Sequence, residues 1–347
     1  MDPLTLTRPD DWHLHLRDGA LLRDVLPHTA RQFARAIVMP NLAPPVATCE
    51  QAAAYRERIL KCLPEGSDFE PLMALYLTPR TTAQEIERAA ASDFVHGVKL
   101  YPAGATTNSE AGLASLEAAH PVFEAMQASG LPLLVHGEST DPACDVFERE
   151  RVFLEQTLAP LLERFDTLRV VVEHITTRDA VHFVESAAER VAATITPHHL
   201  LLNRNALFEG GIRPHHYCLP VLKAEAHRQA LVEAATSGSA KFFLGTDSAP
   251  HLRSAKEQAR GCAGIYSAHA ALELYAEAFE SAGALDRLEA FASFHGPDFY
   301  GLPRNRGRVT LRRERWDVPA IYQAAGAELV PLRAGESVGW KLAGASR

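Results

Sequence analysis

Short apolar segments recur along this chain, and the stretches between them have the composition of amphipathic helices. Segments of this length, mostly bounded by Pro, Gly, Asn or Asp, are typical of buried strands. There are eight, at residues 12–16, 36–39, 71–77, 95–100, 131–136, 168–174, 191–196 and 241–247. Between the third and fourth, Thr81 and Thr82 each precede a Gln or Glu by three residues, which signals the start of a helix.

This alternation predicts parallel strands joined by crossover helices. Eight such strands close a barrel, so we predict an α/β protein with the (β/α)₈ TIM-barrel fold. We expect residues 1–347 to form a single domain, with a C-terminal extension of roughly 302–347 packed on the barrel as strands or loops. Only about ten residues precede the first predicted strand, too few to start a separate β-domain built from both chain ends.

Composition argues against several classes of protein. The 347 residues are 47% hydrophobic, enough for a folded core. The formal charge of -8 comes from intermixed acidic and basic residues, without the basic stripe of a nucleic-acid binder. The sequence also lacks a signal-peptide pattern and an apolar run near the roughly 20 residues of a membrane span. We therefore expect a cytoplasmic protein without nucleic-acid or membrane partners.

Polar residues stand at the carboxyl ends of the predicted strands, where barrels carry their active sites. They are His13, His15, Asn41, Lys99, His136, His174 and Asp247. Because side chains alternate along a strand, His13 and His15 point the same way and together suit one metal ion. A lone buried histidine is more often a core residue bonded to the backbone, but the H-x-H spacing and the other strand-end residues favour zinc. Four imidazoles and a carboxylate are too many ligands for one tetrahedral ion.

Lys99 is the unusual member of this set. An ammonium group among metal ions is repelled, so this lysine must lose its proton or be modified. A neutral amine adds carbon dioxide to form a carbamate, whose two oxygens would bridge two ions about 3.5–4 Å apart. The alternative is a lysine paired with Glu173 or Asp247. Two zinc ions, a carbamate, Asp247 and a hydroxide leave a site that attracts an anion.

These residues and the motifs around them resemble the amidohydrolase superfamily and, more closely, its PyrC-type (class II) dihydroorotases. The motifs are RPDDWHLHLRDG, AIVMPNLAPPV, GVKLYPAGATTNS, PLLVHGE, VVVEHITT, TITPHHLLLNRN, YCLPVLK, FLGTDSAPH and HGPDFYGLP. They cover nearly the whole chain, and their order makes the resemblance specific. It implies one zinc ion on His13, His15 and Asp247, a second on His136 and His174, and N6-carboxylated Lys99 between them.

The same resemblance implies a set of substrate-binding residues. Arg17, Asn41 and His251 correspond to groups that hold a substrate carboxylate, and a guanidinium suits that task because it offers two parallel donors. Leu219 and Ala263 correspond to backbone contacts to the substrate ring, and the metal ligands His15 and His136 also face the substrate. Thr106 and Thr107 match a mobile loop that closes over it, although a plain surface loop fits the sequence equally well.

The implied reaction is the reversible hydrolysis of (S)-dihydroorotate to N-carbamoyl-L-aspartate in pyrimidine (UMP) biosynthesis. Asp247 would move the proton from the attacking water to the leaving nitrogen, and the family suggests a homodimer. One alternative is another cyclic amidohydrolase such as a hydantoinase, although Arg17, Asn41 and His251 would then form an anion site without an anion. The other is an inactive barrel kept as a scaffold, which the intact set of ligand residues disfavours.

Overall fold

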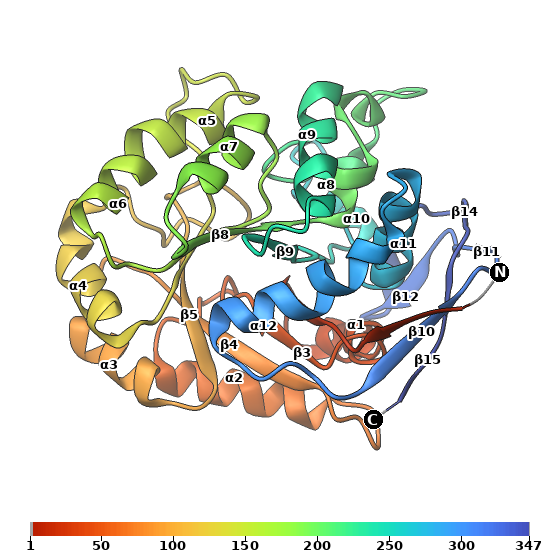
Figure 1. Ribbon diagram of the computed structural model, residues 1–347, viewed down its shortest axis with the longest axis horizontal. Coiled ribbons are helices and arrows are strands. Elements are labelled where there is room, and N and C mark those ends of the chain that lie inside the picture. The colour runs from red at the N-terminus through yellow and green to blue at the C-terminus, as the bar shows by residue number, and fades with distance from the viewer. Residues whose placement is uncertain (1–2, 347) are drawn as a thin grey trace.

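The computed structural model describes residues 3–346 and consists of a barrel of parallel strands surrounded by helices (Figure 1). The eight strands follow one another around the sheet in chain order, and every pair of neighbours is parallel. They are β2 (Asp10–Leu14), β3 (Arg35–Val38), β4 (Glu70–Tyr76), β5 (Val95–Leu100), β6 (Leu133–Val135), β7 (Val170–Val172), β8 (Val191–Ile195) and β9 (Phe242–Leu244). Each lies within or beside one of the eight predicted segments, so the TIM-barrel prediction is confirmed.

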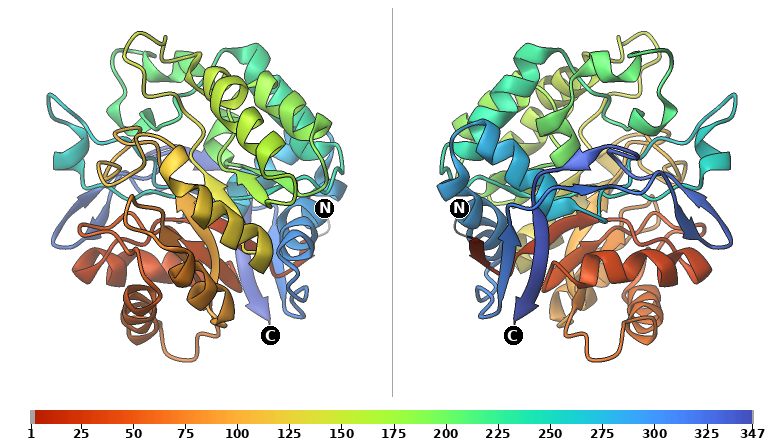
Figure 2. Two further views of the ribbon diagram at one scale, coloured as in Figure 1. Left: turned by 90° about the vertical axis from the view of Figure 1, so that its left-hand side faces the viewer. Right: turned by 90° about the vertical axis from the view of Figure 1, so that its right-hand side faces the viewer.

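Helices form the outer layer of the barrel (Figures 1 and 2). They are α1 (Gly19–Ala30), α2 (Cys49–Lys61), α3 (Ala83–Ala91), α4 (His120–Ser129), α5 (Arg149–Phe153), α6 (Ala159–Arg164), α7 (Arg178–Ser186), α8 (Pro197–Leu201), α9 (Glu225–Thr236), α10 (Arg253–Lys256), α11 (Ala271–Ser281) and α12 (His295–Tyr300). The predicted cap at Thr82 is present, since its side chain accepts a hydrogen bond from the backbone N–H of Glu85. None of the helices in residues 3–346 is both long and apolar enough to cross a membrane.

The first barrel strand contains a β-bulge just before the H-x-H motif. The register between β2 and β3 shifts by one residue between Asp11 and Leu14. As a result Trp12 packs in the barrel interior against Phe243 and Tyr300, although His13 also points into the barrel. Bulges re-aim side chains next to active sites in this way. Trp12 therefore fills the floor of the barrel beneath the histidines.

Hydrogen bonds between β2 and the segment after β9 close the barrel. The backbone N–H of Asp247 donates to the carbonyl of His13 (2.9 Å), and that of His15 donates to Ser248 (3.1 Å). Below them, the buried carboxylate of Asp11 accepts hydrogen bonds from the backbone N–H (2.8 Å) and the hydroxyl of Thr246 (2.5 Å). The two ends of the barrel sheet therefore meet at three of the predicted metal ligands.

Both ends of the chain contribute to a small sheet beside the barrel, a pairing that the sequence did not indicate. Strand β1 (Leu4–Thr7) pairs antiparallel with β10 (Arg308–Arg312), which pairs with β15 (Lys341–Ser346). The remaining C-terminal strands form two short antiparallel pairs, β11 (Trp316–Asp317) with β14 (Ser337–Val338) and β12 (Tyr322–Ala324) with β13 (Ala327–Leu329). The short N-terminal segment therefore pairs with the C-terminal part of the chain in a sheet of only three strands.

The floor of the barrel generates a stability prediction at Gly296 of α12. A Cβ atom there would lie 1.8 Å from Nε1 of Trp12, a clash that requires the ring or the helix to move. We expect Gly296→Ala to lower the free energy of unfolding by about 1–3 kcal/mol, although alanine is normally the better helix former. Urea unfolding of Gly339→Ala is the matched control, because the nearest contact to its added Cβ is 3.7 Å away. Equal stability of the two variants would contradict this packing.

Candidate active site

A small cavity at the carboxyl ends of the strands collects almost every predicted site residue. Its lining comprises His13, His15, Arg17, Asn41, Tyr101, Thr106, Thr107, His136, His174, Leu219, Asp247, Ala249, Ala263 and Gly264. Of the predicted residues only Lys99 and His251 are not part of the lining. Lys99 is completely buried behind it, and His251 contacts Arg17. Side chains from strands far apart in the sequence therefore converge at one point, as the strand-end pattern predicted.

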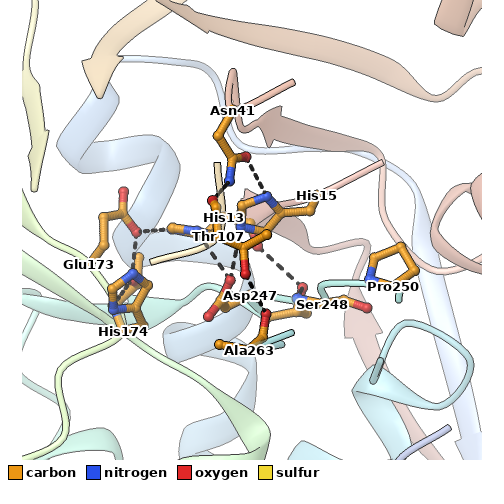
Figure 3. Close-up of polar contacts among 12 residues, drawn as sticks. His13, His15, Asn41, Thr107, Glu173, His174, Asp247, Ser248, Pro250 and Ala263 are labelled. Carbon is orange, nitrogen blue, oxygen red and sulfur yellow. Dashed lines mark hydrogen bonds and ion pairs between the residues drawn. The ribbon is translucent and has the colours of Figure 1, made fainter. Parts of the chain in front are cut away.

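His13, His15 and Asp247 form a group with the geometry of metal ligands (Figure 3). Their donor atoms lie within 4.8 Å of one another, and the Nε2 atoms of His13 and His15 are 3.4 and 3.1 Å from Oδ1 of Asp247. The other ring nitrogen of each histidine is already engaged. Nδ1 of His13 donates to Glu173 (2.7 Å) and Nδ1 of His15 donates to the side-chain oxygen of Asn41 (2.9 Å). Such outer partners fix the tautomer and turn the Nε2 atoms of both histidines toward one point beside Asp247.

The ionisation of this group suits metal binding. Burial lowers the pKa of His15 to about 3, which keeps its imidazole neutral. Burial lowers the pKa of His13 as well, but the carboxylates of Glu173 and Asp247 more than reverse this and the net shift is upward. Burial also opposes ionisation of Asp247, yet hydrogen bonds and charge interactions with His13 and His15 hold its pKa well below the usual value. The group therefore offers an ionised carboxylate between imidazoles.

His136 and His174 stand on the other side of the cavity. The His174 ring centroid is 4.9 Å from those of both His13 and His136, so the imidazoles form a continuous row. Nε2 of His136 donates to Glu138 (2.8 Å), which leaves its Nδ1 as a possible ligand atom. Nδ1 of His174 is buried without a hydrogen-bond partner among the described residues. An unpaired buried imidazole is costly unless something binds it.

Lys99 has the surroundings that a modified lysine requires. Burial lowers the pKa of its ammonium group to about 8, against the opposing effect of Glu173 and Asp247. Within residues 3–346 its Nζ atom has no hydrogen-bond partner and forms no ion pair within 4 Å. The alternative of a lysine paired with Glu173 or Asp247 is therefore not what the structure contains.

Taken together, the donor set fits divalent metal ions. It contains imidazoles, a carboxylate, two buried nitrogen atoms without partners among the described residues and outer groups that orient the histidines. A second group of possible ligands, His198, His199 and Cys218, does not fit as well. Both ring nitrogens of His199 already bond Thr196 (2.7 Å) and the carbonyl of Pro220 (3.1 Å), and burial raises the pKa of Cys218 to about 12.

A cationic pocket adjoins the row of histidines. The Arg17 guanidinium donates to Nε2 of His251 (2.9 Å) and to the carbonyl of Pro250 (3.2 Å), and no carboxylate among the described residues pairs with it. The carboxylate of Asp18, the next residue in the chain, pairs with Arg58 at 2.9 Å and not with Arg17. The charge of Arg17 is therefore available to an anion.

Three residues of the site have a strained backbone. Arg17, His174 and Asp247 adopt φ angles of 60°, 42° and 44°, in the left-handed region that non-glycine residues rarely occupy. Each lies just beyond the end of a barrel strand, where the chain turns sharply out of the sheet. Such strain is concentrated at functional sites, where the surrounding structure enforces it.

The loop with Thr106 and Thr107 covers the cavity. The hydroxyl of Thr107 donates to the carbonyl of Ala263 (3.4 Å). The backbone carbonyl of Thr107 accepts a hydrogen bond from the side-chain amide of Asn41 (3.2 Å), as Figure 3 shows. The space left beneath is about 20 Å³, enough for roughly one water molecule. The loop therefore lies in a closed position.

Glu173, Glu138 and Tyr101 are site residues that the sequence did not single out. Glu173 was considered only as a partner for Lys99, whereas in the structure it orients His13. Glu138 follows His136 by two residues and hydrogen-bonds its ring. The sequence feature that could have predicted both glutamates is an acidic residue close to a strand-end histidine, because histidines that bind metal need hydrogen-bond partners for their other ring nitrogen.

Comparisons with known proteins identify the relatives of this chain. The profile of the Amidohydrolase family matches residues 10–314. A dihydroorotase of Methylobacillus flagellatus is 67% identical over 339 residues, covering 98% of both chains. The Campylobacter jejuni dihydroorotase (pyrC) structure has a TM-score of 0.90 at 36% identity, covering 99% of this chain and 98% of that one. The dihydroorotase of Saccharomyces cerevisiae in complex with 5-fluoroorotic acid has a TM-score of 0.92 at 32% identity, with full coverage of both chains.

Hydantoinases are more distant. The L-hydantoinase of Arthrobacter aurescens has a TM-score of 0.81 at 16% identity, a likeness of fold alone, over 98% of this chain and 83% of that one. The chain belongs to the amidohydrolase family, and within it to the dihydroorotases.

Proposed function

We propose that this protein catalyses the reversible hydrolysis of (S)-dihydroorotate to N-carbamoyl-L-aspartate, a step of pyrimidine biosynthesis. The observation that carries the proposal is the unpaired Arg17 guanidinium beside the group of His13, His15 and Asp247. A cyclic amide with a carboxylate on its ring matches this site, because the amide suits the group of predicted metal ligands and the carboxylate suits the cationic pocket at Arg17. A neutral hydantoin ring would leave the cationic half unfilled, which disfavours a hydantoinase.

We propose further that two zinc ions bind, one to His13, His15 and Asp247 and the other to His136 and His174, with N6-carboxylated Lys99 between them. The unpaired and burial-weakened ammonium of Lys99 supports carboxylation, because only a neutral amine adds carbon dioxide. When bound, zinc would polarise the scissile carbonyl and make water nucleophilic at neutral pH. The row of imidazoles supplies the ligands for this chemistry.

The residues of the chain then have distinct roles in the reaction. Arg17, Asn41 and His251 hold the substrate carboxylate, and the backbones of Leu219 and Ala263 hold the ring. Thr106 and Thr107 close over the substrate and exclude bulk water. Asp247, ionised in this environment, accepts the proton of the attacking water at its carboxylate and delivers it to the leaving ring nitrogen. His15 and His136 lie at the cavity wall, where they also face the substrate.

Two further proposals concern organisation. We propose that residues 1–347 form one catalytic domain, with a C-terminal extension of roughly 302–347, and that the protein is a cytoplasmic homodimer like its family. The three-stranded sheet that joins Leu4–Thr7 to the C-terminal strands supports one folding unit. Sedimentation of the metal-loaded protein at twice the mass of the 37.9 kDa chain would support the dimer, and a monomer mass would refute it.

The proposed function can be tested by measuring the zinc content and the activity of the same purified preparation. Purified protein is expected to contain about two zinc ions per chain and to open the dihydroorotate ring, and dialysis against a chelator should abolish turnover until zinc is returned. Hydantoin serves as the comparison substrate and should be hydrolysed far more slowly. A metal-loaded protein that opens hydantoin but not dihydroorotate would overturn the proposal.

Removal of Lys99 tests the bridging carbamate. Lys99→Ala should lose nearly all activity, with partial recovery when a small carboxylic acid such as acetate is added to take the place of the two carbamate oxygens. Metal content measured in parallel should fall, since a bridging ligand is missing. Turnover at the wild-type rate without added acid would remove the carbamate from the mechanism.

Arg17→Met tests the anion pocket. A hydrogen bond to a charged group contributes about 1.5–3 kcal/mol, so KM for dihydroorotate should rise about 10- to 100-fold while the zinc content stays unchanged. Arg58→Met is the matched control, because Arg58 pairs with Asp18 outside the catalytic cavity and should leave KM unaltered. Unchanged kinetics in Arg17→Met would exclude this residue from carboxylate binding.

A further inference from the structure

Tyr101 carries a buried hydroxyl for which the structure offers no partner. The residue follows β5, lines the catalytic cavity and is 2% exposed. Its hydroxyl oxygen is inaccessible to solvent and has no hydrogen-bond partner among the described residues. A buried hydroxyl without a hydrogen bond is destabilising, and when it lies in an active site it calls for an explanation.

Other buried tyrosines of this chain show that partners are normally present. The Tyr55 hydroxyl donates to the carbonyl of Arg17, and that of Tyr275 donates to the carbonyl of Ile195 (2.7 Å). Tyr300 is a useful exception, since its hydroxyl is also unpaired but its ring stacks on Trp12 in the floor of the barrel, outside the cavity lining. The unpaired hydroxyls therefore belong to two tyrosines that differ in position, since Tyr101 lines the catalytic cavity and Tyr300 does not.

Tyr101 lies in the wall of the cavity that the predicted metal ligands share with Arg17. Its ring centroid lies 5.2 Å from Nζ of Lys99 and 6.2 Å from the His136 ring, on the metal-binding side. Tyr101 also lines the same cavity as Arg17 and Asp247, and that cavity has a volume of only about 20 Å³.

We propose that the Tyr101 hydroxyl donates a hydrogen bond to the substrate carboxylate beside Arg17 and is thus a further substrate-binding residue. A phenol is protonated at neutral pH and is a good donor to an anion. A carboxylate has about four lone-pair positions, so it can accept one hydrogen bond each from Arg17, Asn41, His251 and Tyr101, since Nε of Arg17 already donates to the carbonyl of Pro250. The inference rests on the proposed function, because it requires a substrate that carries a carboxylate.

Tyr101→Phe and Tyr300→Phe form a matched pair, because each removes one unpaired buried hydroxyl and keeps the ring. Both variants are expected to unfold at the wild-type temperature or above it, since a costly orphan group is gone. Tyr101→Phe alone should raise KM for dihydroorotate about 10- to 100-fold and weaken the binding of 5-fluoroorotic acid by a similar factor, with kcat changed much less. Calorimetry measures the binding, and zinc content should be equal in all three proteins.

Several outcomes would overturn the inference. Wild-type KM and wild-type affinity for 5-fluoroorotic acid in Tyr101→Phe would show that the hydroxyl does not touch the carboxylate. A loss confined to kcat would place it elsewhere on the substrate, and a large drop in unfolding temperature would indicate a structural role. If wild-type protein fails to open dihydroorotate, the proposed function fails first, and the binding of 5-fluoroorotic acid to the two variants still decides the role of Tyr101.

Discussion

The site depends on the hydrogen bonds that close the barrel between β2 and the segment after β9. They join the backbones of His13 and Asp247 and of His15 and Ser248, so the residues that complete the sheet are also the predicted ligands of one metal ion. Asp11 strengthens this closure by accepting hydrogen bonds from both the backbone and the hydroxyl of Thr246. Because backbone ladders are rigid, ligand separation is fixed by the fold itself.

The same rigidity explains how the strained residues are tolerated. Asp247 has a positive φ angle, yet its N–H is held by His13, and His174 is held through the Thr194 hydroxyl (2.7 Å), which in turn donates to Glu173 (2.7 Å). Asp247 is therefore fixed directly by His13, another predicted metal ligand, and His174 is fixed through Thr194 and Glu173, the residue that also orients His13. Folding the barrel pre-arranges the ligands, which reduces the reorganisation needed when metal or substrate binds.

The fold could be predicted from the regular recurrence of apolar segments, and most of the site could be predicted from the polar residues at their ends. The eight apolar segments identify the strands, and a polar residue at a strand end stands out against its neighbours. The bulge between Asp11 and Leu14 could not be predicted, since the alternation rule places Trp12 opposite to His13. The pairing of Leu4–Thr7 with β10 joins residues about three hundred positions apart, and no local pattern encodes it. The Tyr101 hydroxyl could not be singled out from the sequence, because a tyrosine at the end of a strand is usually a residue of the hydrophobic core.

Asn41 makes two hydrogen bonds at once, one through each atom of its amide group. Its side-chain oxygen holds the His15 ring, and its amide nitrogen donates to the carbonyl of Thr107 in the closed loop. In the role proposed for Asn41, an incoming carboxylate takes over the donor that Thr107 now occupies. In that case the carbonyl of Thr107 would take the place of a substrate oxygen while the site is empty of substrate, and each catalytic cycle would exchange one oxygen for the other at this amide. Entry of the anion would then require Thr107 to leave Asn41 before the loop closes again over the substrate.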